Sequence, residues 1–404
     1  MTEVRRARIR HRRPWEGLSH NVRVLSGVSL FQDAASEMLY PVLPLFLTGV
    51  LGAPPSVVGL IEGLAEGTAS ILKAASGWLA DRWRRKPLIA AGYGLSSVSK
   101  LLIGFATAWP LVLVARVADR TGKGIRGAPR DALIADDTTK ADRGRAFGFH
   151  RAADTLGAVI GPLIGLAFYY ALDQQMRPLF FIAFIPAAIS VGLIAFVHER
   201  TTTHQERTEA IARRGGTLPP AYRRVVAFLA VFGLVNFTDA LLLLRAKELG
   251  LGFAGVVVVY TLYNATYSLL SYPAGVWSDR VPRRKVFALG IGVFAVAYLG
   301  LGIATSAAWV WVLLPVYGAF TALTDGVSRA WVADLAPDAT GTALGVYAGV
   351  SGAASIAAGV WAGLAWGETG RLPLVISGSV AAVLATVLWV AGGRLESTSP
   401  PSSS

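Results

Sequence analysis

The sequence predicts an all-α integral membrane protein with twelve transmembrane helices in two pseudo-symmetric six-helix bundles. The first observation is composition: 53% of the 404 residues are hydrophobic and 16% are charged, and the mean hydropathy is +0.51, which is too apolar for an ordinary soluble domain. The second is a charged segment that occurs twice, as GWLADRWRRK from Gly77 and as GVWSDRVPRRK from Gly275. A repeat at this spacing, between long apolar runs, indicates a duplicated bundle of helices, which is typical of transporters.

The predicted helices follow one another with short connections. Each apolar run has about 20 residues or more, the length that an α-helix needs to cross the hydrocarbon core. The first bundle is predicted over residues 22–198, with spans at 22–50, 55–80, 87–107, 109–135, 145–172 and 177–198. The second bundle is predicted over residues 223–392, with spans at 223–246, 253–278, 286–305, 308–334, 340–366 and 372–392.

Three polar segments frame the bundles: we expect a basic cytoplasmic tail at 1–21, a cytoplasmic linker at 199–222 and a disordered cytoplasmic tail at 393–404. The net charge of +13 reflects topology rather than nucleic acid binding, because most loop Lys and Arg gather on one side, in loops 81–87, 136–145, 199–222, 279–285 and 335–340. The positive-inside rule then predicts a protein of the cytoplasmic (inner) membrane with both termini in the cytoplasm. The absence of cysteine excludes disulfides and thiolate metal sites.

The repeated charged turns carry a family resemblance. Their marking residues are Gly77, Asp81, Arg82 and Arg85, repeated as Gly275, Asp279, Arg280 and Arg284. Together with the two-times-six topology, they resemble the major facilitator superfamily over residues 20–395. The resemblance implies the major facilitator fold and a gating role for the turns, because in this family the aspartate of the first turn supports the outward-facing state. The family's glycine before the basic pair is missing around Arg84, and Pro282 replaces it in the second copy.

The fifth span contains a glycine pattern, GAVIGPLIG from Gly157. Gly157, Gly161 and Gly165 recur at four-residue steps on one face, which allows a close helix approach, and Pro162 removes a backbone donor and bends the span. The pattern is similar to the motif that marks proton-coupled exporters in the superfamily, so the resemblance implies export. The alternative is that the glycine face only packs helices.

The fourth span is unusually charged for a membrane helix. Its charges recur at three- and four-residue steps and form one stripe: Arg116, Asp119, Arg120, Lys123, Arg126 and Arg130. A charge at the bilayer centre costs about 2.5 to 3.5 kcal/mol, so the stripe must face a cavity or paired partners. Arg120, followed by Lys123 and two glycines, resembles the span-four arginine motif of the superfamily, in which the arginine is associated with proton transfer. The alternative is a structural cation that balances acids of the first two spans.

Two pairs of acids could face this stripe. Asp33 and Glu37 are four residues apart on the first span, as are Glu62 and Glu66 on the second, so each pair shares a helix face. Burial and nearby charge shift the pKa of a carboxylate, so such groups can load and release a proton as a cavity alternates between the two sides of the membrane. We expect Asp33 to lead proton coupling, in a set that comprises Asp33, Glu37, Glu66 and Arg120.

The predicted substrate cavity combines charged, amide and aromatic side chains: Glu62, Arg116, Asp119, Lys123, Asp239, Asn264 and Tyr260. Asp239 is the counterpart of Asp33 in the seventh span, whereas Asn264 aligns with Glu66, so that acid belongs to the first half alone. The alternative for Glu62 and Glu66 is an ion pair with Lys73 or Lys100.

These features predict a secondary active transporter rather than an enzyme. We expect proton-coupled export of a small amphipathic molecule by alternating access, that is, proton antiport and efflux of the multidrug resistance kind. The two halves would rock about a central site, with the turns at Asp81 and Asp279 latching the cytoplasmic side. We expect no cofactor and no metal, a proton as the coupling ion, the lipid bilayer as surroundings and a monomer.

Other functions stay open. A divalent metal exporter could use the carboxylate oxygens of Asp33, Glu37, Glu62 and Glu66. An organic anion transporter could hold a carboxylate or phosphate with Arg116, Arg120 and Lys123. A membrane sensor or enzyme is disfavoured, because the sequence has no His-Glu metal signature, no serine elbow and no phosphate-binding loop.

Overall fold

The computed structural model describes residues 18–139, 142–199 and 218–396, and the side chains of 77–82, 144 and 338 lie outside that description. All regular structure in these ranges is helical, as the sequence predicts. Most of the two predicted tails and of the predicted linker fall outside the described residues. The prediction of disorder from residue 393 is wrong for 393–396, because α15 continues to Glu396.

Seven α-helices and a terminal 3-10 turn at Ile194–Phe196 make up the described first half: α1 (His20–Leu39), α2 (Val42–Gly49), α3 (Pro55–Arg82), α4 (Arg85–Gly104), α5 (Trp109–Asp136), α6 (Arg143–Ala171) and α7 (Arg177–Leu193). The described second half also contains seven: α9 (Pro220–Val235), α10 (Asp239–Glu248), α11 (Phe253–Arg280), α12 (Arg283–Ile303), α13 (Val310–Asp334), α14 (Thr340–Leu364) and α15 (Arg371–Glu396). Short 3-10 turns precede α13 and α14.

The first and seventh predicted spans each consist of two helices rather than one. α1 gives way to α2 at Pro41, whose ring removes the backbone donor that a continuous helix would need there. α9 gives way to α10 across residues 236–238, and the Thr238 hydroxyl caps α10 by accepting a hydrogen bond from the amide of Ala240. The breaks occupy equivalent places, so the duplication extends to an irregularity that hydrophobicity does not predict.

Nine helical segments in the described chain are long and apolar enough to cross a membrane. The remaining predicted spans coincide with α1 and α2, with α3 and with α5. The first of these is broken, and α3 and α5 carry the charges that were expected to face a cavity. The composition therefore supports a multi-pass membrane protein, whereas the crossing of the bilayer by each of twelve segments stays a prediction.

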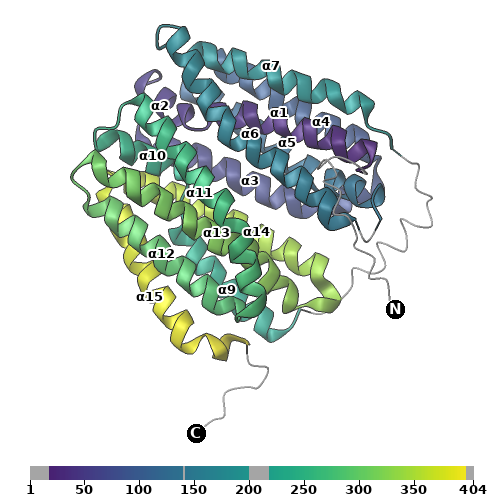
Figure 1. Cartoon of the computed structure of the whole chain (residues 1–404). Helices are drawn as coiled ribbons and strands as arrows, with labels where there is room; N and C mark the ends of the chain where they lie inside the picture. Colours follow the sequence, from purple (N-terminus) through teal and green to yellow (C-terminus); the bar gives the residue numbers. More distant parts are fainter. Residues whose placement is uncertain (1–17, 140–141, 200–217, 397–404) are drawn as a thin grey trace, which may run out of the picture.

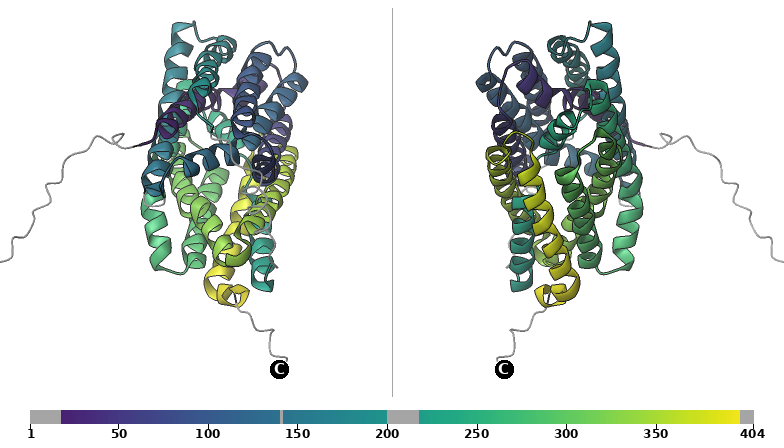
Figure 2. Two further views of the ribbon diagram at one scale, coloured as in Figure 1. Left: turned by 90° about the vertical axis from the view of Figure 1, so that its right-hand side faces the viewer. Right: turned by 90° about the vertical axis from the view of Figure 1, so that its left-hand side faces the viewer.

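The helices form two bundles that Figure 1 separates by colour, with α1 to α7 in purple to teal and α9 to α15 in green to yellow. Figure 2 shows the same division from two further sides. Inside the first bundle α1 packs against α6 and α4 against α5, and inside the second α12 packs against α15 and α11 against α13. The most extensive packing across the boundary between the bundles joins α3 with α14 and α6 with α11, and α10 adds smaller contacts with α2 and α3.

The α3–α14 contact is made by glycines on both helices. A Cβ added to Gly59 would lie 2.3 Å from the carbonyl oxygen of Gly359, and one added to Gly359 would lie 2.8 Å from the Cα of Gly63. Further along, a Cβ on Gly352 would lie 2.8 Å from the carbonyl oxygen of Gly67. The two bundles therefore meet backbone to backbone along this line, which we call the glycine seam.

The glycine pattern of the fifth span lies on a different contact. A Cβ on Gly161 would lie 2.5 Å from the carbonyl oxygen of Ala34, and one on Gly165 would lie 2.7 Å from the Cγ of Met38. Both neighbours belong to α1, so this glycine face packs α6 against α1 inside the first bundle. Pro162 is buried within α6.

Candidate functional site

A cavity of about 420 Å³ lies between the two bundles. Its walls come from α1, α3, α4, α5 and α6 of the first half and from α11 and α13 of the second. Two adjoining cavities of about 370 and 680 Å³ share Arg329 with it. They extend to Phe147, Gly275 and Gly341, near the helix ends that the charge pattern predicts to be cytoplasmic.

The opposite end of the boundary is closed by contacts between the two halves. The rings of Tyr40 and Tyr260 stack with centroids 5.2 Å apart, and those of Tyr169 and Phe253 stack at 3.8 Å. The Tyr260 hydroxyl also donates a hydrogen bond of 2.5 Å to Glu37. This conformation is therefore sealed at the end that the charge pattern predicts to face the exterior.

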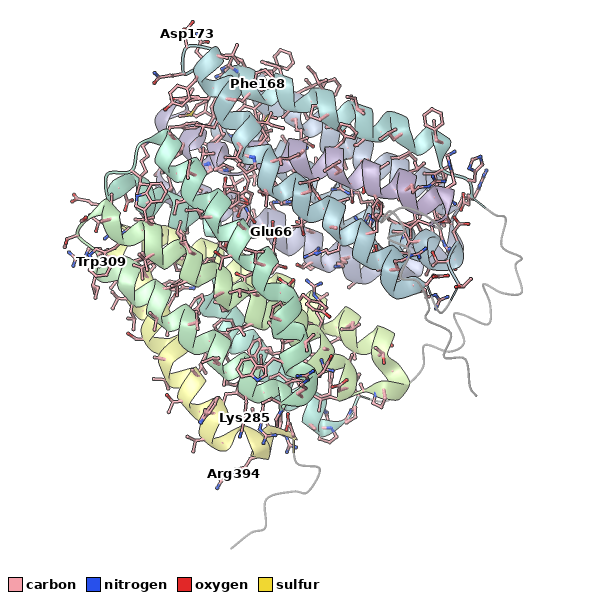
Figure 3. The ribbon with its side chains drawn as sticks, in the orientation of Figure 1. Glu66, Phe168, Asp173, Lys285, Trp309 and Arg394 are labelled. Atoms are coloured by element: carbon pink, nitrogen blue, oxygen red, sulfur yellow. The ribbon has the colours of Figure 1, made fainter. Side chains whose placement is uncertain are left out.

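Charged side chains line the central cavity, and the cations outnumber the acids. The acids are Asp33, Glu37, Glu66 and Asp154, and the cations are Lys73, Lys123, Arg126, Arg130, Arg151 and Arg329. Figure 3 shows Glu66 between the two bundles. A cavity lined mainly by one sign of charge concentrates ligands of the opposite sign, so this lining favours anions.

Behind the cavity wall, Glu62 and Arg116 form a buried ion pair. Arg116 donates to both carboxylate oxygens of Glu62, at 2.6 Å from Nε and 2.8 Å from Nη2. Arg116 also donates to Asp119 at 3.0 Å, and Lys100 lies 4.0 Å from the same carboxylate. Buried charges need such partners because their desolvation is costly.

The predicted cavity residues Glu62, Arg116 and Asp119 therefore compensate one another and do not line the central cavity in this conformation. The alternative partners of Glu62, Lys73 and Lys100, do not bind it, since Arg116 occupies both of its oxygens.

Glu66 and Arg120 connect the buried network to the cavity. Nη2 of Arg120 lies 2.9 Å from the Glu66 carboxylate, and the Glu66 side chain is 39% exposed whereas that of Arg120 is 7% exposed. The Nε of Arg120 has no hydrogen-bond partner in the described part of the chain. A molecule in the cavity can thus reach the acid but not the arginine.

Asp33 and its predicted counterpart Asp239 have different surroundings. Asp33 lines the cavity and forms no hydrogen bond or ion pair with any other described residue. Asp239 begins α10, outside the cavity lining, and accepts hydrogen bonds from Tyr317 at 2.6 Å and Tyr263 at 3.0 Å. The prediction that Asp239 is the counterpart of Asp33 is therefore wrong: Asp33 lies in α1 before the break, whereas Asp239 begins α10 after the break, and the two are 206 rather than 198 residues apart.

The remaining predicted residues of α5 and α11 divide between the cavity and its sealed end. Lys123 and Asn264 line the cavity, whereas Tyr260 contacts Glu37 and Tyr40 at the sealed end. The acids of the metal hypothesis do not gather in this conformation, and within the described ranges no three His, Asp or Glu side chains lie close enough to hold a metal.

Charged turns lie at equivalent helix ends of the two halves. Arg85, at the start of α4, forms an ion pair with Asp136 at the end of α5. Arg283, at the start of α12, pairs at 2.7 Å with Asp334 at the end of α13. Each pair joins two neighbouring helices of the same bundle. Arg283 and Asp334 follow Arg85 and Asp136 by 198 residues, which is also the separation of Gly77 and Gly275.

The predicted gating residue Arg284 occupies another position: it pairs with Glu396, so Arg283 rather than Arg284 is the structural copy of Arg85. Asp279 is 70% exposed and lies 3.5 Å from Arg283, Gly275 lines a cavity, and Arg280 is exposed. The side chains of Gly77, Asp81 and Arg82 lie outside the described residues.

Sequence reasoning missed a chain of polar contacts that crosses the boundary. Arg151 of α6 donates to the Tyr267 hydroxyl at 3.1 Å, and that hydroxyl donates to Asp325 of α13 at 3.0 Å. Tyr267 follows Tyr260 and Asn264 at helical spacing, which places it on the same face of α11, but its partners come from α6 and α13, and a pattern within one helix does not predict them. Arg151 belongs to no such pattern.

Comparison with known proteins gives one family and one fold. The model of the Major Facilitator Superfamily matches residues 25–238 and 225–404. An uncharacterized MFS-type transporter of Methanocaldococcus jannaschii is 33% identical over 381 residues, which cover 92% of this chain and 94% of that protein.

More distant similarities extend to named transport proteins. The multidrug resistance protein MdtH of Photorhabdus laumondii is 26% identical over 65% of this chain and 67% of its own length. Among solved structures, a peptide transporter with bound sulfate superposes with a TM-score of 0.77 at 14% identity, over 93% of this chain and 94% of that chain, a likeness of fold alone.

Proposed function

Since this chain belongs to the major facilitator superfamily and is a membrane transporter rather than an enzyme, we propose that it exports a small amphipathic molecule in exchange for protons by alternating access. The central cavity is the substrate site, and Asp33 is the carboxylate that couples transport to protons. Glu37, Glu66 and Arg120 complete the coupling set.

The environment of Asp33 is the observation that carries the coupling proposal. Its carboxylate lines the cavity without a hydrogen bond or ion pair to any other described residue. The charged side chains with the strongest electrostatic interaction with the Asp33 carboxylate are Asp154, Lys123 and Arg126. An acid that is open to the cavity and free of fixed partners can gain and lose a proton without breaking a structural contact.

The glycine face of α6 supports the same assignment. A Cβ added to Gly157 would lie 2.7 Å from the carbonyl oxygen of Leu30 and 3.1 Å from the Cβ of Asp33. Gly157 therefore allows α6 to approach the turn of α1 that carries the proposed proton site. The resemblance of this glycine pattern to an exporter motif thus coincides with a contact at the coupling carboxylate.

A relative also supports export as the proposed direction, since a protein at low identity is named as a multidrug resistance protein. The present conformation opens at the predicted cytoplasmic end, a state that alternating access requires for either direction of transport. In the proposed cycle the substrate enters there, the halves rock about the glycine seam, and a proton reaches Asp33 from the exterior as the substrate leaves.

The experiment uses purified protein in liposomes that contain a pH-sensitive dye, with ethidium, octanoate and Mn²⁺ as probes of three charge classes. We expect the wild type to move protons when one probe is added. Asp33→Asn should abolish gradient-driven transport while the protein stays monodisperse. The matched control is Asp173→Asn, at an exposed residue with φ of 51°, a conformation that asparagine tolerates. Gradient-driven transport at the wild-type rate in Asp33→Asn would exclude Asp33 as the coupling group.

A further inference from the structure

Two lysines of the central cavity have no counter-ion. Lys73 of α3 and Lys123 of α5 are exposed to the cavity and form no hydrogen bond or ion pair with any described residue. The other cations of the lining have partners, since Arg126 donates to Ser96, Arg130 to Asp131, Arg151 to Tyr267 and Arg329 to Asp325.

The acids of the lining do not compensate the two lysines. Glu37 is held by Tyr260 and Glu66 by Arg120, while Asp154 lies 3.8 Å from His150 and 3.9 Å from Arg151. Asp33 is the one acid of this described lining that has no partner. Arg126 and Glu37 have only neutral partners, so the cations of the lining without an ion pair to a described residue are Lys73, Lys123 and Arg126, against the acids Asp33 and Glu37. One positive charge is left over in this count, and an anion from outside the chain would restore the balance.

The second half supplies an unused hydrogen-bond donor to the same cavity. Asn264 of α11 is 8% exposed and lines the cavity; its side chain lies next to the Tyr260 hydroxyl, but its Nδ2 makes no hydrogen bond of good geometry in the described part of the chain. A buried amide donor without an acceptor is unfavourable. An oxygen atom of a ligand in the cavity would satisfy it.

A neighbouring cavity with apolar side chains on one wall adjoins Lys73. Lys73 also lines the neighbouring cavity of about 680 Å³, whose α14 wall presents Leu344, Tyr347 and Ala348. A molecule with its polar end at Lys73 can therefore extend an apolar body along α14 without leaving the connected cavities.

We propose that the substrate is an amphipathic organic anion. Its carboxylate or phosphate binds Lys73, Lys123 and the amide of Asn264, and its apolar body lies against α14. The inference rests on the proposed transport function and names its substrate class. Lysine and amide donors from both halves would then bind one molecule, so the substrate joins the two bundles at the open end.

The test is equilibrium binding to the full-length protein in nanodiscs, with empty nanodiscs as background. Three probes share an eight-carbon chain and differ in the head group: octanoate, octyl phosphate and octyltrimethylammonium. Acetate supplies the head group alone. We expect both octyl anions to bind, acetate to bind at least about tenfold more weakly, and octyltrimethylammonium not to compete.

Substitutions then separate the lysines from general effects of charge. Lys73→Gln and Lys123→Gln should each weaken octanoate binding about tenfold or more, equivalent to about 1.4 kcal/mol, whereas Lys73→Arg should retain most of the affinity. The matched control is Lys247→Gln, an exposed lysine at the end of α10, which should leave binding unchanged. Repeating the assay with phosphatidate in the nanodiscs identifies the source of the ligand: competition indicates a membrane lipid, and its absence a free molecule.

Two results would overturn the anion site: octyltrimethylammonium binding as tightly as octanoate, or wild-type octanoate affinity in both Lys→Gln variants. No gradient is present in this assay, so its outcome is independent of coupling. Loss of proton-driven transport with intact octanoate binding would count against the proposed coupling alone. Transport of ethidium in place of octanoate would count against the anion alone.

Discussion

Glu62 and Arg116 illustrate what a single contact contributes at the residue scale. Both side chains are buried, and the arginine donates to both carboxylate oxygens. Glu62→Gln leaves the guanidinium with one carboxylate partner, Asp119, in place of two, and we expect a loss of stability of up to about 3 to 5 kcal/mol, the range for broken buried pairs. Thermal unfolding in detergent measures it as a lower Tm.

A matched control for this prediction is Asp279→Asn. Its carboxylate also lies next to an arginine, at 3.5 Å, but is 70% exposed, so its loss should cost about 1 kcal/mol or less. Equal decreases in Tm for the two variants would mean that burial does not determine the strength of the Glu62 pair. The double variant Glu62→Leu with Arg116→Met should recover part of the loss, because neither member of the pair is then left buried without the other, while Asp119 keeps Lys100 as its neighbour.

Residue types in the sequence predicted that the charges of α3 and α5 need partners, but not which ones. The pairing of Glu62 with Arg116 rather than with Lys73 or Lys100 depends on the rotation of α3 against α5, which a helical pattern within one segment does not encode. Asp33 and Asp239 make the same point, since an acid in the first predicted span of each copy falls on opposite sides of the helix break and has different neighbours. The residues of one helix show that a buried charge needs a partner, whereas the tertiary structure determines which residue that partner is.

At the scale of an element, glycines in two helices should respond to alanine in opposite ways. An alanine Cβ at Gly161 would lie 2.5 Å from the carbonyl oxygen of Ala34, whereas one at Gly94 meets nothing within 4 Å. We expect Gly161→Ala to destabilise the protein by about 1 to 3 kcal/mol through overpacking. Gly94→Ala should be neutral or stabilising by up to about 1 kcal/mol, because alanine favours the helix.

Thermal unfolding of the two variants side by side checks this prediction, with intact monodispersity before heating as the control. If Gly161→Ala were as stable as Gly94→Ala, the close contact of α6 with α1 would not be a constraint on the fold.

The positions of the helices follow from apolar length, but their irregularities do not. The predicted spans coincide with helices in both halves, whereas the breaks at Pro41 and at 236–238 were missed, because hydrophobic residues continue beyond each break and apolar length alone does not reveal it. The prediction that Arg284 is the copy of Arg85 was wrong for a related reason. Matching the letters RRK selects Arg284, but Pro282 adds one residue before α12, and the helix register selects Arg283.

At the scale of the molecule, alternating access predicts opposite changes at the two ends. Because the native chain has no cysteine, spin labels can be attached to introduced cysteine pairs. Asp173 and Trp309 lie in different halves at the sealed end (Figure 3), and Thr139 and Lys285 lie in different halves at the open end. We expect a switch of conformation to lengthen the first distance and to shorten the second.

Pulsed electron paramagnetic resonance at neutral and acidic pH measures these distances. A third pair, Lys285 with Arg394, serves as the control because both residues belong to the second bundle (Figure 3). That distance should not change. If the distances across the sealed end and across the open end both lengthened, the two bundles would be separating as a whole rather than exchanging one open end for the other.

The glycine seam has a further consequence for the speed of this exchange. Bulky side chains that interlock across a moving contact must change rotamer before the surfaces can slip, and each change adds to the activation barrier. Between Gly59, Gly63 and Gly359 the facing atoms belong to the main chain, so no rotamer has to change at these positions. The two bundles can therefore move against each other at the glycine seam with a low activation barrier. The turnover rate would then be set by the contacts that close the two ends of the boundary.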